Sequence, residues 1–346
     1  MNLKEIATYS NVRRFQLFNG NLFYIYDKNQ LKIEGLKADV NFGKAQHSSD
    51  LFILDRLLIW SSARGHSLAY DLINETVIFE DTSGDNYCTI PDIGALVEGK
   101  LFYYNRLVDG TNQYFLFDFV SKNIQEFPCK IRKVISYEGN SILLDWDIDN
   151  GNDLIRFNTD GELIWRFPIN GTFLNYNRSV RDIRVQRVLG VYNDLLWIIL
   201  ANEDLIGVDI VYGKEVYSFK AGRHIQLDTN LGEIVGCLNN MLYRIDLNEE
   251  KLMGVNVDFS SSALQHDIQA DYKINGMTFD NEYIYFSDMM RGKIGLLDRT
   301  TVEVIEVMDL KLDLNSIDNI EDLRVHGNKL YALDWRHVVH EIEMIE

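Results

Sequence analysis

The sequence predicts an all-β fold, a closed β-propeller of four-stranded blades. One pattern recurs along the whole chain: an apolar strand ends in Asp or Asn, a tight polar turn follows, and a second strand of alternating apolar residues comes next. Self-similarity at roughly 40 to 50 residues with only strands inside the unit is typical of propellers. The recurring polar position is occupied by Asp71, Asp118, Asn158, Asp209, Asp246 and Asp298.

A second apolar strand precedes each of these positions and allows the units to be counted independently. Most of these strands follow a turn rich in Asn, Gly, Asp or Lys, as expected of a hairpin. They cover residues 22–26, 57–60, 101–104, 142–144, 195–200, 234–237, 283–286 and 330–333. We therefore predict eight blades, with seven as the alternative if the first unit, around residues 30–34, forms no sheet of its own.

The last unit is incomplete, because residues 330–333 are followed by one more apolar segment, 337–345, and then the chain ends. The segment 3–9 precedes the first unit and has no partner of its own. We predict that this N-terminal strand closes the last blade, since a closed ring leaves no open sheet edge.

Composition favours one domain over residues 1–346. Hydrophobic residues make up 46% of the chain, aromatic residues 12%, and only 3 prolines interrupt it. The first residues carry charge where a signal peptide is apolar, and no apolar stretch approaches the ~20 residues of a membrane span. We therefore expect a cytoplasmic protein that does not enter a membrane.

The net charge indicates which partners to expect, and the cysteine spacing indicates whether a metal or redox motif is present. The chain holds 34 basic and 52 acidic residues, a net charge of −18, which repels the phosphate backbone of nucleic acids. We expect no nucleic acid and no anionic membrane as partner, and a protein with a basic surface instead. Cys88, Cys129 and Cys237 are too far apart for a zinc or redox motif, so reduced thiols are predicted.

Some units look like known repeats. Residues 283–288, Tyr-Ile-Tyr-Phe-Ser-Asp, followed by 292–298, Gly-Lys-Ile-Gly-Leu-Leu-Asp, resemble the repeat of NHL and YWTD propellers, and residues 330–334 are similar. Residues 157–165, with their turn and Trp165, resemble PQQ-like blades. The resemblance implies the propeller fold and a protein that binds something, because these families share little chemistry.

The long loops that leave the outer strand or join the second and third strands are predicted to gather on one face. Such loops are often functional; the alternative is that they only bridge blades of unequal width. One of them holds alternating carboxylates, Asp145, Asp147 and Asp149, beside Trp146. Its Gly and its twelfth position do not match a calcium loop. We therefore expect a solvated acidic turn and neither metal nor cofactor.

A second loop adds aromatic and basic side chains. Residues 173–181 contain Tyr176 and Arg178 in an otherwise acidic protein, and such residues are enriched at interface hot spots. No nucleophile elbow, phosphate loop or Cys/His dyad is present. His337 and His340 are three apart on an expected strand, so their side chains point to opposite faces and cannot share a metal. The candidate binding residues are Asp109, Asp145, Trp146, Asp147, Asp149, Tyr176 and Arg178.

Two functions remain open. The first is a non-catalytic propeller whose acidic loop face captures a basic protein, for example as an inhibitor or immunity protein. The second is a metal-dependent hydrolase of the lactonase kind with its site in the central channel. The Glu-Gly-Pro opening of gluconolactonase-like propellers is missing near residues 13–18, and we rank the hydrolase second. Three acidic or amide side chains at one end of the channel would favour it.

Overall fold

The computed structural model consists of β-strands and turns, and none of its described residues is helical. It describes residues 2–26, 30–33, 40–41, 50–54, 56–62, 66–81, 87–89, 96–106, 112–146, 153–174, 178–221, 224–238, 241–248, 257–258, 274–288, 292–301, 303–310 and 320–345. The chain divides into two compact units: unit 1 holds Met1–Arg13 with Lys220–Glu346, and unit 2 holds Arg14–Phe219. One domain over residues 1–346 stays a prediction.

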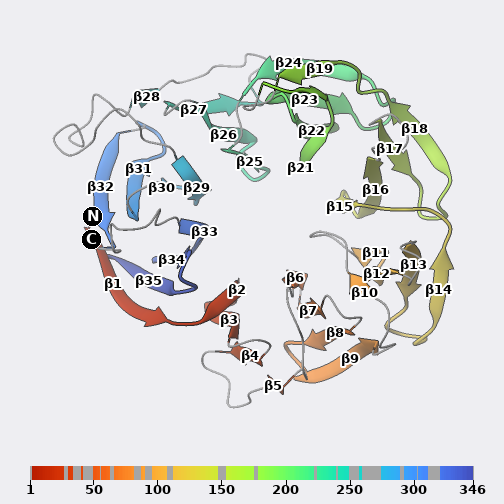
Figure 1. Cartoon of the computed structure of the whole chain (residues 1–346), viewed down its shortest axis with the longest axis horizontal. Coiled ribbons are helices and arrows are strands. Elements are labelled where there is room, and N and C mark those ends of the chain that lie inside the picture. Colours follow the sequence, from red (N-terminus) through yellow and green to blue (C-terminus); the bar gives the residue numbers. More distant parts are fainter. Residues whose placement is uncertain are drawn as a thin grey trace. The chain divides into compact units, whose positions relative to one another are not determined.

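Unit 2 contains five antiparallel sheets of four or five strands in its described part (Figure 1). The strands of each sheet follow one another along the chain. The first two sheets are β2 (Val12–Phe18), β3 (Asn21–Tyr26), β4 (Gln30–Ile33) and β5 (Val40–Asn41), then β6 (Asp50–Leu54), β7 (Leu57–Ser62), β8 (His66–Asp71) and β9 (Thr76–Asp81). The first repeat unit thus forms a sheet of its own.

The other sheets of unit 2 follow the same plan, and a small two-stranded sheet is inserted between the last two. The third sheet has β10 (Tyr87–Thr89), β11 (Leu96–Val97), β12 (Lys100–Arg106), β13 (Asn112–Phe117) and β14 (Ile124–Phe127). The fourth has β15 (Lys133–Tyr137), β16 (Asn140–Trp146), β17 (Leu154–Phe157) and β18 (Leu163–Phe167). The insert is β19 (Thr172–Leu174) with β20 (Val180–Asp182), and the fifth sheet is β21 (Val185–Tyr192), β22 (Leu195–Leu200), β23 (Asp204–Asp209) and β24 (Glu215–Lys220).

Unit 1 contains three four-stranded antiparallel sheets in its described part. The first is β25 (His224–Asp228), β26 (Glu233–Leu238), β27 (Met241–Asp246) and β28 (Val257–Asp258), and the second is β29 (Ile274–Phe279), β30 (Tyr283–Asp288), β31 (Lys293–Asp298) and β32 (Val304–Asp309). The third combines β33 (Ile320–His326), β34 (Lys329–Asp334) and β35 (Val339–Ile345) with the N-terminal β1 (Asn2–Tyr9). All eight strands predicted as second strands lie in β3, β7, β12, β16, β22, β26, β30 and β34.

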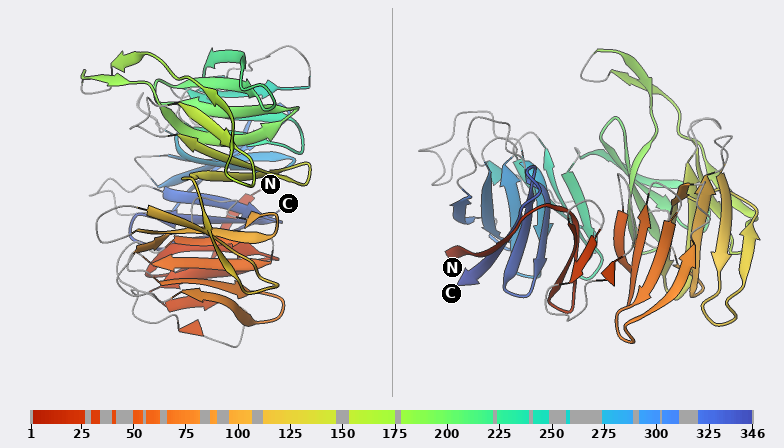
Figure 2. Two further views of the ribbon diagram at one scale, coloured as in Figure 1. Left: turned by 90° about the vertical axis from the view of Figure 1, so that its right-hand side faces the viewer. Right: turned by 60° about the horizontal axis from the view of Figure 1, so that its bottom comes forward.

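The pairing of β1 with β35 confirms that the N-terminal strand completes the last sheet. The two strands are antiparallel, with Asn2 opposite Ile345 and Tyr9 opposite Val339, and Figure 2 shows them side by side. The Tyr9 hydroxyl donates a hydrogen bond of 2.6 Å to the Glu341 carboxylate. A closed ring of eight such blades stays a prediction.

The recurring Asp or Asn is a turn cap. In the turn after β8, one carboxylate oxygen of Asp71 accepts hydrogen bonds from the backbone N–H groups of Ile73 and Asn74, at 2.9 and 3.1 Å. Asp118 caps the turn after β13 in the same way. These N–H groups hold the pKa of Asp118 below its usual range. The repeat seen in the sequence is therefore a repeated Asx turn, which needs a short polar side chain at this position.

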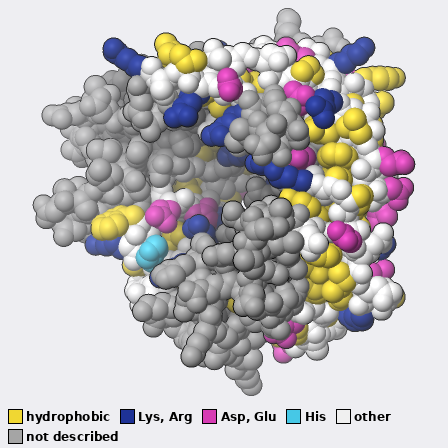
Figure 3. All heavy atoms as spheres, turned by 45° about the vertical axis from the view of Figure 1, so that its right-hand side comes forward, with side chains coloured by type: hydrophobic (Ala, Val, Ile, Leu, Met, Phe, Trp, Pro, Cys, Tyr) yellow, Lys and Arg dark blue, Asp and Glu magenta, His cyan; other side chains and the backbone are white. Residues whose placement is uncertain are grey.

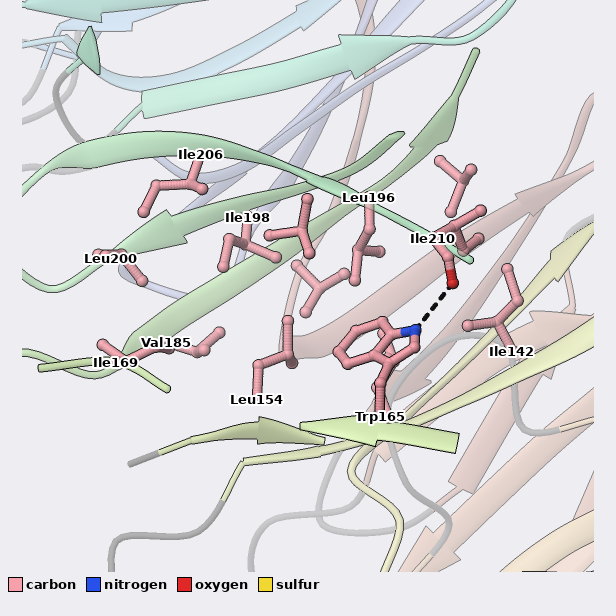
Figure 4. Close-up of a cluster of buried hydrophobic side chains, with 14 residues drawn as sticks. Ile142, Leu154, Trp165, Ile169, Val185, Leu196, Ile198, Leu200, Ile206 and Ile210 are labelled. Atoms are coloured by element: carbon pink, nitrogen blue, oxygen red, sulfur yellow. Dashed lines mark hydrogen bonds between the residues drawn. The ribbon is translucent and has the colours of Figure 1, made fainter. Parts of the chain in front are cut away.

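The cores lie between neighbouring sheets, where the second and third strands are the most buried. One cluster in unit 2 packs Leu154 of β17 and Trp165 of β18 against Leu196 and Ile198 of β22 (Figure 4). The indole N–H of Trp165 donates a hydrogen bond of 2.8 Å to the carbonyl of Ile210. This bond satisfies the buried polar atom of the ring, so Trp165 joins the fourth and fifth sheets without an unpaired group.

Candidate functional site

The structure describes three of the seven residues that the sequence assigns to binding: Asp145, Trp146 and Arg178. The other four, Asp109, Asp147, Asp149 and Tyr176, lie outside the described residues. Because each sheet is antiparallel, the connection between its second and third strands and the connection to the next sheet leave at the same end. We call this the loop end; the described candidates of unit 2 belong to it.

The expectation that Asp145 belongs to a solvated loop is wrong. Asp145 and Trp146 are the last two residues of β16, paired with Ile155 and Leu154 of β17. Asp145 is only 5% exposed, whereas the Trp146 side chain is half-buried. The strand continues past its apolar run because the sheet pairing, rather than the hydrophobic pattern, decides where it ends.

Asp145 has a basic neighbour that the sequence did not suggest. Nε of Arg132 lies 3.3 Å from a carboxylate oxygen of Asp145, and the guanidinium lies 5.8 Å from the centre of the Trp146 ring. Arg132 therefore compensates the buried charge and packs on the indole. Asp145 orients Arg132 and Trp146 at the loop end of the fourth sheet and presents little surface itself.

Cys129 lies close to this group and is not a nucleophile. Burial and the negative charge of Asp145 raise the pKa of its thiol to about 12. A thiol with so high a pKa is protonated at neutral pH and unreactive. Cys129 is a free cysteine, in agreement with the reduced thiol predicted at this position.

Asp153 ends the acidic turn and is engaged within its own sheet. Its carboxylate lies 3.3 Å from the Arg166 guanidinium of β18. The Asp153 side chain is 15% exposed and that of Arg166 is 48% exposed. The pair lies at the point where the chain enters β17.

The second predicted loop is a β-hairpin that projects from the sheets of unit 2. Strands β19 and β20 pair with each other, with Leu174 opposite Val180, and both views of Figure 2 show the hairpin extending away from the neighbouring sheets. Arg178 lies in its turn with φ 57°. No strand was predicted here, because three residues on each side are too few to show an alternating pattern.

The hairpin exposes apolar side chains on one of its faces. Leu174 is 68% exposed and Val180 is 66% exposed, and residues directly opposite each other in an antiparallel pair have side chains on the same face. Arg178 and Arg181 are exposed as well. A projecting two-stranded ribbon with exposed aliphatic and arginine side chains is suited to contact another protein.

A buried charge cluster in unit 1 was not predicted from the sequence. The Arg299 side chain is 2% exposed and its Nη2 lies 2.7 Å from the Asp228 carboxylate and 2.8 Å from that of Glu233. The guanidinium also lies 4.7 Å from the centre of the Phe279 ring. Arg299 follows a turn cap, Asp298, and no local pattern marks it. We interpret the cluster as structural, since every charge in it is paired.

Contrary to the sequence prediction, His337 and His340 do not lie on one strand. His337 lies in the turn before β35 with φ 64°, so the alternation of a strand does not apply to it. His340 is in β35, and its ring nitrogens lie 3.0 Å from the Glu5 carboxylate and 3.4 Å from that of Asp334. Burial disfavours the charged ring, but hydrogen bonds to Asp334 and Glu5 outweigh it and raise the pKa of His340. His340 thus ties β1 to β35.

Two features are absent from the described part of the chain: a metal-binding group of side chains and a long apolar helix. No group of three or more His, Cys, Asp or Glu in the described part of the chain is placed to hold a metal ion. In the same residues there is no helix long and apolar enough to cross a membrane.

Comparison with known proteins identifies the fold. No family model matches the sequence, and no curated protein matches it. Among solved structures, the chain is similar to BamB from Moraxella catarrhalis, with a TM-score of 0.60, 13% identity and coverage of 99% of this chain and 100% of that one.

Two further solved structures are similar to this chain over its full length. The C-terminal WD40 domain of Sif2 has a TM-score of 0.61 at 13% identity, and Sqt1 from Saccharomyces cerevisiae has a TM-score of 0.64 at 8% identity; both comparisons cover 99% of each chain. These neighbours are β-propellers, a fold that commonly serves as a scaffold for binding proteins. With its four-stranded antiparallel sheets and full coverage, this chain has the β-propeller fold.

Proposed function

We propose that this propeller is a non-catalytic, protein-binding protein whose partner docks on the loop end of unit 2. One observation carries the proposal: the hairpin β19–β20 projects from the sheets and exposes Leu174 and Val180 on one face. Covering one such side chain contributes about 1.5 to 3 kcal/mol of apolar burial. Two such anchors, opposite each other on a ribbon, supply a large part of the energy of a protein interface.

The proposed interface also includes the other candidate binding residues. It includes Trp146, held in place by Arg132, and Arg178 in the hairpin turn, and we extend it to the residues outside the described part. Those are Asp109, Asp147, Asp149 and Tyr176. Asp145 contributes as a positioning residue, because its carboxylate is paired and buried.

Charge suggests the kind of partner. The net charge of −18 favours a protein with a basic surface, because long-range attraction accelerates the encounter. The hairpin region itself has a positive net charge, since residues 170–184 hold three arginines and one aspartate. We infer that the partner has a basic surface overall and meets the hairpin with a neutral or acidic patch. An inhibitor or immunity protein that blocks a basic enzyme is one form of this function.

The test is affinity capture from the native cell followed by mass spectrometry, with two matched variants. In the hairpin variant, Leu174→Thr and Val180→Thr, the residues keep their strand propensity but lose apolar surface. The control variant changes Ile6 and Ile305, which are 42% and 39% exposed in unit 1, to Thr. A partner that the wild type and the control retain and the hairpin variant loses supports the proposal. A partner retained equally by all three proteins contradicts it.

A further inference from the structure

The opposite end of the sheets of unit 2 shows an unexpected feature. Here lie the tight turns between the first and second strands and between the third and fourth strands, and we call it the turn end. The turns after β8, β13 and β23 expose aliphatic residues at the position two after the capping Asp. These are Ile73 at 66% exposure, Val120 at 93% and Val211 at 57%, and Tyr212 beside Val211 is 71% exposed.

The fold does not require apolar residues at these positions. In unit 1 the equivalent position of the same Asx turn is occupied by Asn248 after Asp246 and by Thr300 after Asp298, and both backbone N–H groups donate to the capping carboxylate at 2.8 Å. In the fourth sheet of unit 2 it is Asp160. A polar residue therefore satisfies the turn equally well, so the Asx turn itself does not account for the three exposed aliphatic residues of unit 2.

Two of the three turns that carry these apolar tips contact a neighbouring sheet. The carbonyl of Ile210 accepts the indole N–H of Trp165, and a Cβ at Gly213 would approach the Trp165 ring to 2.7 Å, so this turn packs tightly on the fourth sheet. In the turn after β13, the Lys122 ammonium lies 3.4 Å from the carbonyl of Ile78 in the second sheet. Contacts of this kind reduce the conformational entropy that a turn loses when a partner covers it.

The surface between the tips is acidic. Hydrophobic and acidic side chains lie next to one another toward the right-hand edge of the view in Figure 3. The described turns of unit 2 expose six acidic residues, Glu75, Glu98, Glu138, Asp160, Glu162 and Asp194, against three basic residues, Arg56, Lys122 and Lys214. A ligand that covers the tips is therefore favoured when it carries positive charge.

A small cavity lies in the same region. Its volume is about 120 Å³, and its lining includes Glu98 and Lys100 of the third sheet and Asp160 in the turn of the fourth. Two carboxylates and one ammonium leave the cavity with a net negative charge at neutral pH. Its size and charge suit the end of one lysine or arginine side chain.

We propose that the turn end of unit 2 is a second docking surface, which takes a basic amphipathic segment of a partner protein. Apolar side chains of the segment cover Ile73, Val120 and Val211, and one basic side chain enters the cavity between Glu98 and Asp160. This site is separate from the loop end and does not depend on the function proposed there.

Binding can be measured by fluorescence anisotropy with synthetic peptides. The probe is a 14-residue peptide of alternating Lys and Leu, and the matched controls replace Leu by Ser or Lys by Glu. We expect the wild type to bind the Lys/Leu peptide at least tenfold more tightly than either control. In the triple variant Ile73→Thr, Val120→Thr and Val211→Thr, the preference for Lys/Leu over Lys/Ser disappears. The variant Glu98→Gln with Asp160→Asn weakens binding of both lysine peptides.

Several outcomes would overturn the proposal. Unchanged Lys/Leu binding by the triple variant would show that the apolar tips take no part, and tight binding of the Glu/Leu peptide would contradict the role of charge. Self-association of the wild type that the triple variant abolishes would assign the surface to a second copy of this chain. The hairpin variant with Thr at 174 and 180 separates the two proposals: it should bind the Lys/Leu peptide as the wild type does.

Discussion

The pairing of β1 with β35 predicts a specific pattern of stability changes along one strand. Leu3 is 8% exposed and belongs to the core cluster that includes Leu330 and Ile342, whereas Ile6, on the same strand, is 42% exposed. We change each to Ala. A buried leucine shortened to alanine loses apolar contacts and leaves a cavity, which costs about 2 to 5 kcal/mol. Because a terminal strand can relax around the cavity, we expect Leu3→Ala to lower the free energy of unfolding by about 2 kcal/mol, the low end of this range.

This free energy converts into a measurable shift of the melting temperature. Unfolding entropy is about 2.1 cal/mol/K per residue, so a chain of 346 residues that unfolds in one step has an entropy of roughly 0.7 kcal/mol/K. Leu3→Ala should therefore lower Tm by about 3 °C. Ile6→Ala should lower it by less than about 1 °C, because substitutions at exposed sites cost within ~0.5 kcal/mol.

The assay is urea unfolding followed by tryptophan fluorescence, with calorimetry for Tm. Deleting residues 1–10 should have a larger effect than either substitution, because it removes the whole strand and opens the edge of β35. If Leu3→Ala and Ile6→Ala destabilise the protein equally, or if the deletion leaves Tm unchanged, β1 does not complete the last sheet.

Three further predictions concern charged groups. Glu5→Gln should destabilise the protein more at pH 6 than at pH 9: the raised pKa of His340 makes its pairing complete below the ordinary value of about 6.5 and lost as the pH rises through the folded pKa. Arg299→Met should cost about 3 to 5 kcal/mol, because the buried Asp228 carboxylate loses its ion-pair partner, whereas Glu233 keeps Arg244 at 3.6 Å. Millimolar Ca²⁺ should shift Tm little, since we expect the turn with Asp147 and Asp149 to be a solvated one.

Each of these predictions has a control. Glu303→Gln, at an exposed position in unit 1, should destabilise the protein equally at pH 6 and pH 9. If Glu5→Gln also destabilises it equally at both pH values, the Glu5–His340 pair does not contribute to stability through the charge of His340. A cost of Arg299→Met below about 1 kcal/mol would mean that the buried Asp228 carboxylate does not depend on Arg299. A rise of several degrees with Ca²⁺ that Asp147→Ala with Asp149→Ala abolishes would establish a metal site in that turn.

The sequence predicted the parts of the fold that depend on local periodicity. The capping position at Asp71 or Asp118 and the apolar second strands are each encoded within a few residues, and all were placed correctly. The pairing of β1 with β35 followed from counting strands, because a spare strand and an incomplete sheet satisfy each other. These are local or topological properties, which a single sequence contains.

Contacts between distant residues were not predictable. Arg299 meets Asp228 and Glu233 from more than sixty residues away, and nothing beside it in the sequence indicates burial. Asp145 was expected in solvent because carboxylates usually are, but Arg132 compensates its charge in the interior. Residue chemistry alone does not tell a paired buried carboxylate from a solvated one.

The dependence of association on salt tests the central claim, that the acidic propeller captures a basic protein partner. With the partner purified after capture, the association and dissociation rate constants are measured between 50 and 500 mM NaCl. Steering by the net charge of −18 predicts that the association rate falls steeply with salt while the dissociation rate changes little, because screening acts mainly on the encounter. Charge reversal at Asp147 and Asp149 should slow association further. An association rate that is independent of salt and of these charges would contradict the account.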